Sequence, residues 1–307
     1  MIEVLVIGAS GFVGKRLALG LLNAGRQVRG LARTLEKVQD LAKAGGEVVK
    51  GDITDLESMK SALRSAEAAY ICTHSLSRQA TDSSKGYMDV ELLGLENIVV
   101  ACKANGVRRL IYVTSLGVSP ESPCEWLRER WKGEQYLLSS GLDVTIIRPG
   151  QIVGRAGRSF DMMVGQARKR LALVLGGGRV RMQGIAIDDL VYYLIGVLEQ
   201  PRAVGHCFDV SCDEVLTIDE IIDVISDVLK MPRPMKLHIP LALLAAVAPI
   251  TERVRRLPKG AVRGALDGLK TDFTGDPMPI RELLPKRLCS YRQAVEQALI
   301  GKKDDHG

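Results

Sequence analysis

The chain has 307 residues, of which 46% are hydrophobic and 25% are charged, and its formal net charge is +6. This length and these proportions of hydrophobic and charged residues exclude a disordered chain. They allow a large core, in one extended α/β domain or in a domain with a smaller appendage. The mild basic excess argues against nucleic acid as a partner and suits a small anionic ligand.

The first predicted elements are a strand, a glycine-rich turn and a helix. An apolar run, Val4 to Ile7, leads into a G-x-x-G-x-x-G turn and then into a helical pattern from Leu17. Such a turn lets a phosphate approach the backbone and directs N–H groups and the helix dipole at it. An ordinary strand-to-helix corner is the alternative. We predict a dinucleotide site that includes Gly8, Ser10, Gly11, Phe12, Val13 and Gly14.

The second predicted strand, residues 27–33, ends in a basic residue. In dinucleotide folds an acidic residue at this tip binds the adenosine 2′-OH, whereas a basic one accommodates a 2′-phosphate. Arg33 stands at the tip, and no carboxylate follows before Glu36. We therefore predict that Arg33 favours NADP(H), with NAD(H) as the second choice; a solvated surface arginine is the alternative.

The third and fourth predicted strands, residues 47–50 and 68–73, also end in polar residues. Asp52 and Ile53 follow the third strand, where the Asp52 carboxylate could reach the adenine amino group or stabilise the turn before a helix near Asp55. Thr73 and His74 follow the fourth strand, at the edge where open parallel sheets bind ligands. We count all four among the cofactor-binding candidates.

Helical patterns cover residues 86–104 and 123–139, and strands cover 110–115 and 144–147. In this order, the elements make the chain resemble the extended and atypical short-chain dehydrogenase/reductases. The resemblance rests on GASGFVG, GDITD, NIVVACKANGVRRLIYVTSLGV, KGEQYLLSSGLDVTIIRPGQIVG and VLTIDEIIDVISDVL. It is strongest to the atypical NAD(P)H-binding branch, the NmrA-like and complex-I-39-kDa-subunit-like proteins. It implies an α/β, Rossmann-type doubly wound parallel sheet of roughly seven strands with a small C-terminal substrate cap.

The resemblance also implies a catalytic group. Active family members use a serine, a tyrosine and a lysine, with the last two spaced Y-x-x-x-K on one helix face. Ser115 aligns with the serine and Lys132 with the lysine, but Arg128 stands where the tyrosine is expected. Arginine donates no proton at neutral pH. Three interpretations follow: nucleotide binding without turnover, another acid (Tyr136, Tyr112, His74 or water), or reduction of an activated C=C or C=N bond.

The segment Pro149, Gly150 and Gln151 resembles the family stretch beside the nicotinamide, and it completes the cofactor-binding candidates. A basic region follows, in which Arg155, Arg158 and Arg181 are candidates for a carboxylate or phosphate pocket. We expect a dinucleotide-binding domain over residues 1–154 and a substrate region over 155–307, with about 180–212 returning to the sheet. Asp188 or Asp189 is the expected helix N-cap, and Thr217 with Glu220 forms a capping box.

Residues 238–263 combine an apolar run, Leu241 to Ile250, with basic residues at 253, 255, 256, 259 and 263. This run is too short to span a bilayer. It predicts either a buried or partner-facing helix or a contact with a membrane surface.

Six scattered cysteines with no CxxC pair are typical of free thiols in a reducing compartment. The sequence shows no leader pattern, so we expect the cytoplasm; we predict no metal site and make no prediction of oligomeric state. The leading hypothesis is an NADP(H)-binding oxidoreductase acting on a small molecule. One alternative is a non-catalytic redox sensor or assembly factor. Another is a nucleotide-sugar epimerase or dehydratase, but the missing tyrosine argues against this second alternative.

Overall fold

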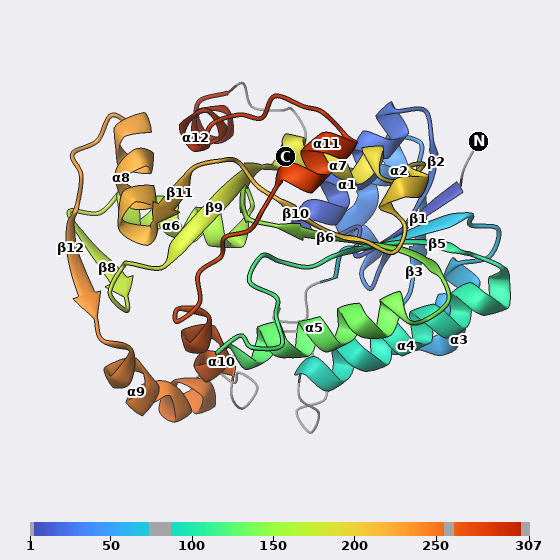
Figure 1. Cartoon of the computed structure of the whole chain (residues 1–307), viewed down its shortest axis with the longest axis horizontal. Helices are drawn as coiled ribbons and strands as arrows, with labels where there is room; N and C mark the ends of the chain where they lie inside the picture. Colours follow the sequence, from blue (N-terminus) through green and yellow to red (C-terminus); the bar gives the residue numbers. More distant parts are fainter. Residues whose placement is uncertain (1–2, 74–86, 255–260, 302–307) are drawn as a thin grey trace. The chain divides into compact units, whose positions relative to one another are not determined.

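The computed structural model describes residues 3–73, 87–254 and 261–301, which fall into two compact units (Figure 1). Unit 1 comprises Met1–Thr114, Arg130–Arg148 and Val191–Phe208, and unit 2 comprises Ser115–Glu129, Pro149–Leu190 and Asp209–Gly307. Each unit therefore draws on three separate stretches of the chain.

A seven-stranded sheet organises unit 1, in the order β10-β6-β5-β4-β1-β2-β3. The strands are β1 (Glu3–Ile7), β2 (Gln27–Ala32), β3 (Glu47–Lys50), β4 (Ala68–Ile71), β5 (Arg109–Val113), β6 (Asp143–Pro149) and β10 (Cys207–Val210). The pairings from β3 through to β6 are all parallel. The order reverses between β1 and β4, and ligands of such sheets bind at the carboxyl ends of the strands beside this reversal.

The helices of unit 1 follow from apolar residues at helical spacing. They are α1 (Phe12–Asn23), α2 (Gln39–Lys43), α3 (Leu56–Ala62), α4 (Tyr87–Asn105) and α5 (Glu125–Leu138), with η1 (Leu35–Val38) and η2 (Pro201–Ala203) as 3-10 turns. In Figure 1, α3, α4 and α5 lie on one side of the sheet and α1 and α2 on the other. A core of buried side chains such as Leu5, Ile71, Ile98 and Tyr112 joins the sheet to α3 and α4. The expected doubly wound sheet is confirmed.

Unit 2 contains two small sheets, β11-β9-β7 and β12-β8. Their strands are β7 (Gln151–Val153), β8 (Leu171–Leu175), β9 (Arg181–Ala186), β11 (Val215–Thr217) and β12 (Met235–Ile239). The helices are α6 (Arg158–Ala167), α7 (Ile187–Gly196, which continues into unit 1), α8 (Ile218–Val228), α9 (Leu241–Val254), α10 (Ala261–Gly268), α11 (Met278–Leu283) and α12 (Tyr291–Leu299). The second core, with Phe160, Ile221, Ile225 and Val295, packs α6, α8 and α12 together.

Two predictions about caps have opposite outcomes. The Thr217–Glu220 capping box is present at the start of α8. The N-cap prediction for Asp188 or Asp189 is wrong, because α7 already begins at Ile187. The buried Asp189 carboxylate instead accepts a hydrogen bond from Cys289 N–H (3.1 Å) and pairs with Lys286 (3.3 Å), so it anchors the C-terminal segment. Over the described residues, we find no helix with the length and apolarity needed to cross a membrane.

Candidate nucleotide site

The glycine turn between β1 and α1 has no room for side chains at two of its glycines. Gly8 has φ +88°, and a Cβ there would lie 3.0 Å from the backbone of Cys72, which follows β4. A Cβ on Gly14 would lie 2.2 Å from the Gly8 carbonyl oxygen. Glycine is thus required for the chain to fold this tightly against the neighbouring strand.

The same turn presents the start of α1 as an anion site. Gly11 is the N-cap and carries no side chain to cap the helix, and its N–H donates to the Gly8 carbonyl (2.9 Å). The first N–H groups of a helix have no partner within it. Ser10 and Gly11 are exposed, while Phe12 and Val13 are half-buried. This geometry suits a pyrophosphate, which would meet backbone N–H groups and the positive helix end.

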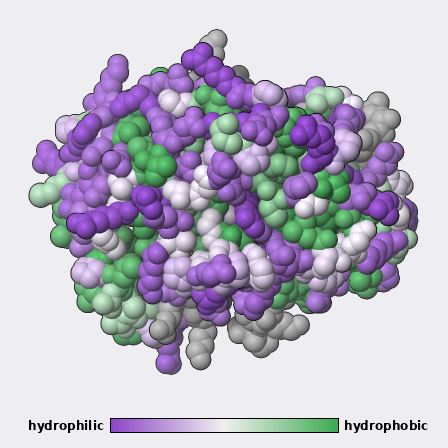
Figure 2. Space-filling model, viewed as in Figure 1, coloured by the Kyte–Doolittle hydropathy of each residue, from purple (hydrophilic) through white to green (hydrophobic). Residues whose placement is uncertain are grey.

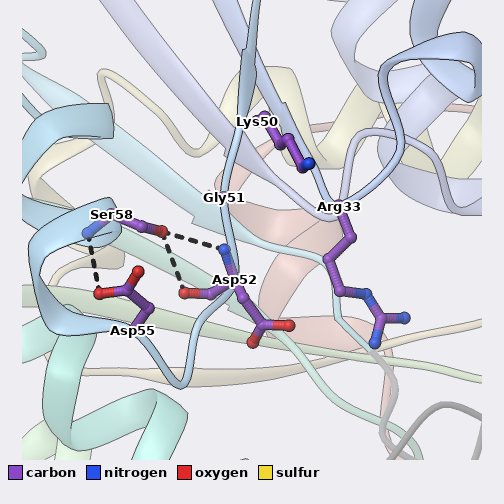
Figure 3. Close-up of a pocket in the computed structure, with 6 residues that line it drawn as sticks. All are labelled: Arg33, Lys50, Gly51, Asp52, Asp55 and Ser58. Atoms are coloured by element: carbon purple, nitrogen blue, oxygen red, sulfur yellow. Dashed lines mark hydrogen bonds between the residues drawn. The ribbon is translucent and has the colours of Figure 1, made fainter. Parts of the chain in front are cut away.

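A pocket of about 420 Å³ lies at the carboxyl ends of β2 and β3, still within unit 1 (Figure 3). It is lined by Arg33, Lys50, Gly51, Asp52, Asp55 and Ser58. Arg33 and Asp52 were predicted from the sequence to belong to one site, and the fold brings them together.

Lys50 is a lining residue that the sequence analysis missed. The pairing of Ala32 with Lys50 places the ends of β2 and β3 side by side, so Arg33 and Lys50 both reach one pocket. Figure 3 shows the two cationic side chains on the same side of the segment through Gly51. The sequence signal that could have identified Lys50 was that β2 and β3, which are adjacent parallel strands, each end at a cation. Two cations around one cavity suit a phosphate dianion.

The two carboxylates that line this pocket, Asp52 and Asp55, accept different hydrogen bonds. Asp52 Oδ1 accepts from the Thr54 N–H (3.0 Å) and hydroxyl (2.9 Å), which is the turn chemistry that the sequence left open. Asp55 caps α3 by accepting from Glu57 N–H and Ser58 N–H. Ser58 in turn accepts from the Asp52 N–H (3.0 Å), which fixes the floor of the pocket.

The other predicted residues at this sheet edge are less engaged. Ile53 is half-buried, and its carbonyl accepts from the Asn97 amide of α4 (2.9 Å). Thr73 is half-buried directly after Cys72, whose N–H donates to the Ile7 carbonyl (2.9 Å). His74 lies outside the described residues.

A cluster of buried polar side chains lies at the carboxyl end of β5 and is called the buried polar cluster. Its buried members are Glu91, Tyr112, Thr114, Arg130 and Glu134, and the half-buried Arg148 completes it. Arg130 is only 1% exposed; it pairs with Glu91 (3.2 Å) and lies over the Tyr112 ring. Glu134 accepts from the Thr114 hydroxyl (2.7 Å) and from Arg148 Nε (3.1 Å). Charge pairing compensates the burial of these groups.

The contacts of this cluster decide whether Tyr112 is suited to act as a proton donor. The Tyr112 hydroxyl donates to Glu91 (2.7 Å), and burial raises the pKa of Tyr112 well above its ordinary value. Burial also raises the pKa of Tyr136. Neither phenol is suited to give up a proton at neutral pH. The sequence did not reveal the cluster, because its members come from α4, β5, α5 and β6.

The predicted catalytic pair is divided between the units. Lys132 is exposed on α5 and belongs to unit 1. Ser115 belongs to unit 2, where its hydroxyl donates to the Leu116 carbonyl (3.0 Å). Arg128, which replaces the expected tyrosine, donates to the Ser122 carbonyl (2.6 Å) and so has a structural contact.

The segment after β6 has a constrained backbone. A Cβ on Gly150 would lie 2.2 Å from the Gln183 carbonyl, and the Pro149 carbonyl accepts from Leu116 N–H (3.0 Å). The buried Gln151 amide donates to Ser159 (3.3 Å) and accepts from the Tyr291 hydroxyl (2.7 Å). The Gln151 side chain is thus held by protein contacts within unit 2.

Two of the three arginines predicted for an anion pocket are committed elsewhere. Arg155 donates to the carbonyls of Ala298 (2.6 Å) and Leu299 (3.0 Å) at the end of α12. Arg181 pairs with Asp272 (2.7 Å), and Arg158 is exposed at the start of α6. Because Arg155 and Arg181 are held by these other contacts, they do not form the predicted anion pocket.

The chain matches a family model described as NAD(P)H-binding over residues 8–172, which include the glycine turn, the pocket and the whole buried polar cluster. Among solved structures it resembles the NADPH-dependent quinone oxidoreductase QOR2 from Escherichia coli, complexed with NADPH. That likeness has a TM-score of 0.75 at 19% identity and covers 96% of this chain and 99% of that one.

Two relatives illustrate the range of related proteins. One is the mitochondrial NADH dehydrogenase [ubiquinone] 1 alpha subcomplex subunit 9 of Arabidopsis thaliana, 27% identical over 82% of this chain but only 64% of its own length. The other is the 2-alkyl-3-oxoalkanoate reductase of Stenotrophomonas maltophilia, 24% identical over 94% of this chain and 89% of its own. One name describes a subunit of an assembly and the other an enzyme.

Proposed function

Since the chain belongs to the NAD(P)H-binding family, we propose that it is an NADP(H)-dependent oxidoreductase that acts on a small organic substrate. The observation that carries the preference for NADP(H) is the pocket in which Arg33 and Lys50 converge from adjacent strands. The 2′-phosphate is what distinguishes NADP(H) from NAD(H), and two cations around one cavity can neutralise it.

The residues present fit a dinucleotide. The turn glycines leave a cradle that a Cβ would fill, and the start of α1 offers N–H groups to the pyrophosphate. The adenosine would lie beside Asp52 and Ile53, with its 2′-phosphate at Arg33 and Lys50. The family resemblance would give Lys132 the role of binding the nicotinamide ribose, and it would give the Pro149–Gln151 backbone a place beside the nicotinamide. The bound reduced cofactor supplies hydride.

On the substrate side, we assign Ser115 to orient the acceptor by a hydrogen bond from its hydroxyl. Arg128 stands in place of the tyrosine, and the Tyr112 hydroxyl donates to Glu91, so we assign the proton that completes the reduction to a water molecule, with His74 as the alternative donor. This arrangement favours substrates that need little acid assistance, such as an activated C=C bond or a readily reduced oxo group. The reductase among the relatives supports an oxo compound.

The test is a titration of the purified chain with NADPH, NADH, NADP⁺ and NAD⁺, followed by nicotinamide fluorescence. We expect NADPH to bind at least about tenfold more tightly than NADH, which corresponds to about 1.4 kcal/mol. A screen of oxo compounds and enones for NADPH oxidation follows. Equal affinities would refute the 2′-phosphate assignment, and no binding would refute the nucleotide site itself.

A second candidate is a non-catalytic NAD(P)H-binding sensor or assembly factor. The replacement of the tyrosine by Arg128, whose guanidinium contacts Ser122, favours it, and one relative is named as a subunit of a larger complex. Lys132→Ala separates the candidates. An enzyme should lose turnover while some NADPH binding remains, whereas a sensor shows no turnover with any substrate in either form. The cytoplasmic location stays a prediction.

A further inference from the structure

The β8–β12 ribbon of unit 2 turns its apolar residues outward. Along β8, Ala172 and Val174 are buried, while Leu171, Leu173 and Leu175 are 44%, 41% and 39% exposed. The parallel register sets Met235 and Leu237 of β12 beside Leu171 and Leu173, and these two are 73% and 51% exposed. Side chains alternate between the faces of a strand, so these residues share one face.

The other face of β12 carries polar residues. Lys236 pairs with Asp223 of α8 (2.6 Å), and His238 contacts Asp219 of the same helix (2.9 Å). A half-exposed strand normally buries its apolar residues and exposes its polar ones. Here Lys236 is half-buried in an ion pair while Met235 and Leu237 on either side of it are exposed.

Helix α9 extends this surface. Its exposed residues Leu243, Val247, Ile250 and Val254 recur at spacings of four, three and four, and they are 59%, 43%, 67% and 76% exposed. Ala248 and Glu252 are buried on the opposite side. At the end of β8, a Cβ on Gly176 would contact Leu241, so α9 starts against the ribbon. Figure 2 shows hydrophobic atoms at the lower left, where Figure 1 draws α9.

Positive charge borders this apolar face. Arg168, Lys169 and Arg170 are exposed directly before β8, and Arg253 is exposed near the end of α9. On α8, Asp223 pairs with Lys236, Asp227 pairs with Arg233, and Asp219 contacts His238. Among the described residues, the exposed cations at 168–170 and 253 therefore supply positive charge beside the apolar face. Of the basic residues expected between 238 and 263, those at 255, 256 and 259 lie outside the described residues.

We propose that the outward face of β8 and β12, together with the exposed stripe of α9, docks on an anionic lipid surface. Large exposed apolar patches mark interaction sites. An apolar face bordered by cations binds the interfacial region of a bilayer in two ways: its apolar side chains are buried there, and its cations are attracted to the anionic lipids. Over its described residues α9 has 14 residues, which is too few to cross a bilayer, so the proposed contact is with the membrane surface. The inference is independent of the Arg33–Lys50 pocket, whose lining residues belong to unit 1.

The test is flotation of the full chain with vesicles of phosphatidylcholine alone or with about 30% phosphatidylserine, which sets the negative surface potential. We expect binding to the anionic vesicles, weakening as salt is raised, and little binding to the neutral ones. Leu237→Ser with Ile250→Ser should lower partitioning by about tenfold or more. Arg168→Glu, Lys169→Glu and Arg170→Glu together should lower it by about a hundredfold.

The matched controls change exposed residues of unit 1. Val100→Ser, at a site that is 47% exposed, and Lys103→Glu should leave partitioning unchanged. NADPH titration of every variant checks that the fold is kept and separates failure of this proposal from failure of the nucleotide site. Absence of binding to anionic vesicles would overturn the proposal. A dimer in light scattering that dissociates with Leu237→Ser and Ile250→Ser would assign the face to a second copy and overturn it as well.

Discussion

At the scale of single residues, the proposed preference for NADPH rests on Arg33 and Lys50, which line one pocket. A bound phosphate dianion would be attracted to both cations. The guanidinium can bind a phosphate with two parallel hydrogen bonds, whereas the ammonium acts as a point charge. We therefore expect the two residues to contribute unequally.

Replacing Arg33 by alanine should weaken NADPH binding by about 10- to 100-fold, since a hydrogen bond to a charged group contributes about 1.5–3 kcal/mol. Lys50→Ala should cause a smaller loss. NADH affinity should stay unchanged in both variants, because NADH has no 2′-phosphate. Fluorescence titration measures all of these affinities, and Lys103→Ala, on the surface of α4, is the control. An equal loss for both nucleotides would mean that Arg33 supports the fold instead.

The glycine turn makes a second prediction. In Gly14→Ala the new methyl group meets the Gly8 carbonyl at 2.2 Å, so the turn must shift. We expect a destabilisation of about 1–3 kcal/mol, typical of overpacking, together with loss of NADPH affinity. The control is Gly165→Ala in α6, where a Cβ would have no neighbour within 4 Å. That change should stabilise by about 0.5–1 kcal/mol. Thermal unfolding with and without NADPH reports both effects.

At the scale of elements, the buried polar cluster joins α4, β5, α5 and β6. Arg130→Met would leave Glu91 buried without its cation, which costs about 3–5 kcal/mol. Adding Glu91→Gln should recover part of the loss, since the neutral amide can still accept from Tyr112. Urea unfolding measures these differences. Arg108→Met, which breaks the exposed pair with Asp143, should cost far less, because solvent screens an exposed ion pair. A similar cost for both arginines would contradict the assigned role of the cluster.

Helix α8 predicts a dependence on pH. The hydrogen bond from Arg233 and the contact with Arg292 of α12 lower the pKa of Asp227 to about 2 from its ordinary 3.8. A depressed carboxyl pKa stabilises the fold above the unfolded pKa, and this stabilisation is lost as pH falls toward 2. Asp227→Asn should therefore be less stable than the parent at pH 7, by under about 1 kcal/mol because the site is exposed. The difference should vanish near pH 2 in urea unfolding, and a difference that grows in acid would contradict the mechanism.

Comparing the structure with the predictions shows which features can be inferred from the sequence alone. Strand β3 has the predicted bounds, and α4 differs by one residue at each end, because apolar periodicity and Gly106 delimit these elements locally. Arg33 was found because it follows a strand. Lys50 and the buried polar cluster were missed, since their significance depends on which strands are neighbours. The apolar run at 241–250 was recognised, but the outward register of β8 and β12 required the pairing itself.

At the scale of the whole molecule, the nucleotide pocket and the apolar face belong to different units. NADPH at one hundred times its Kd should stabilise the folded state by about 2.7 kcal/mol. In hydrogen exchange, we expect NADPH to protect residues 8–14 and 50–58 and to leave β8 and β12 unchanged. Anionic vesicles should give the reverse pattern. Protection of β8 by NADPH alone would show that the two surfaces are coupled.

The way the chain alternates between the units has a consequence for biosynthesis. β6 gains its outer partner β10 only when residues 207–210 have been made, so a nascent chain lacks one edge of the sheet until then. Unit 2 needs α12 as well, which lies more than a hundred residues after its first strand β7. Neither unit can be finished as an early, independent folding module, in contrast to a protein whose domains are contiguous in sequence. Truncated translation products should therefore be substrates for chaperones and proteases, with no stable half-molecule left behind.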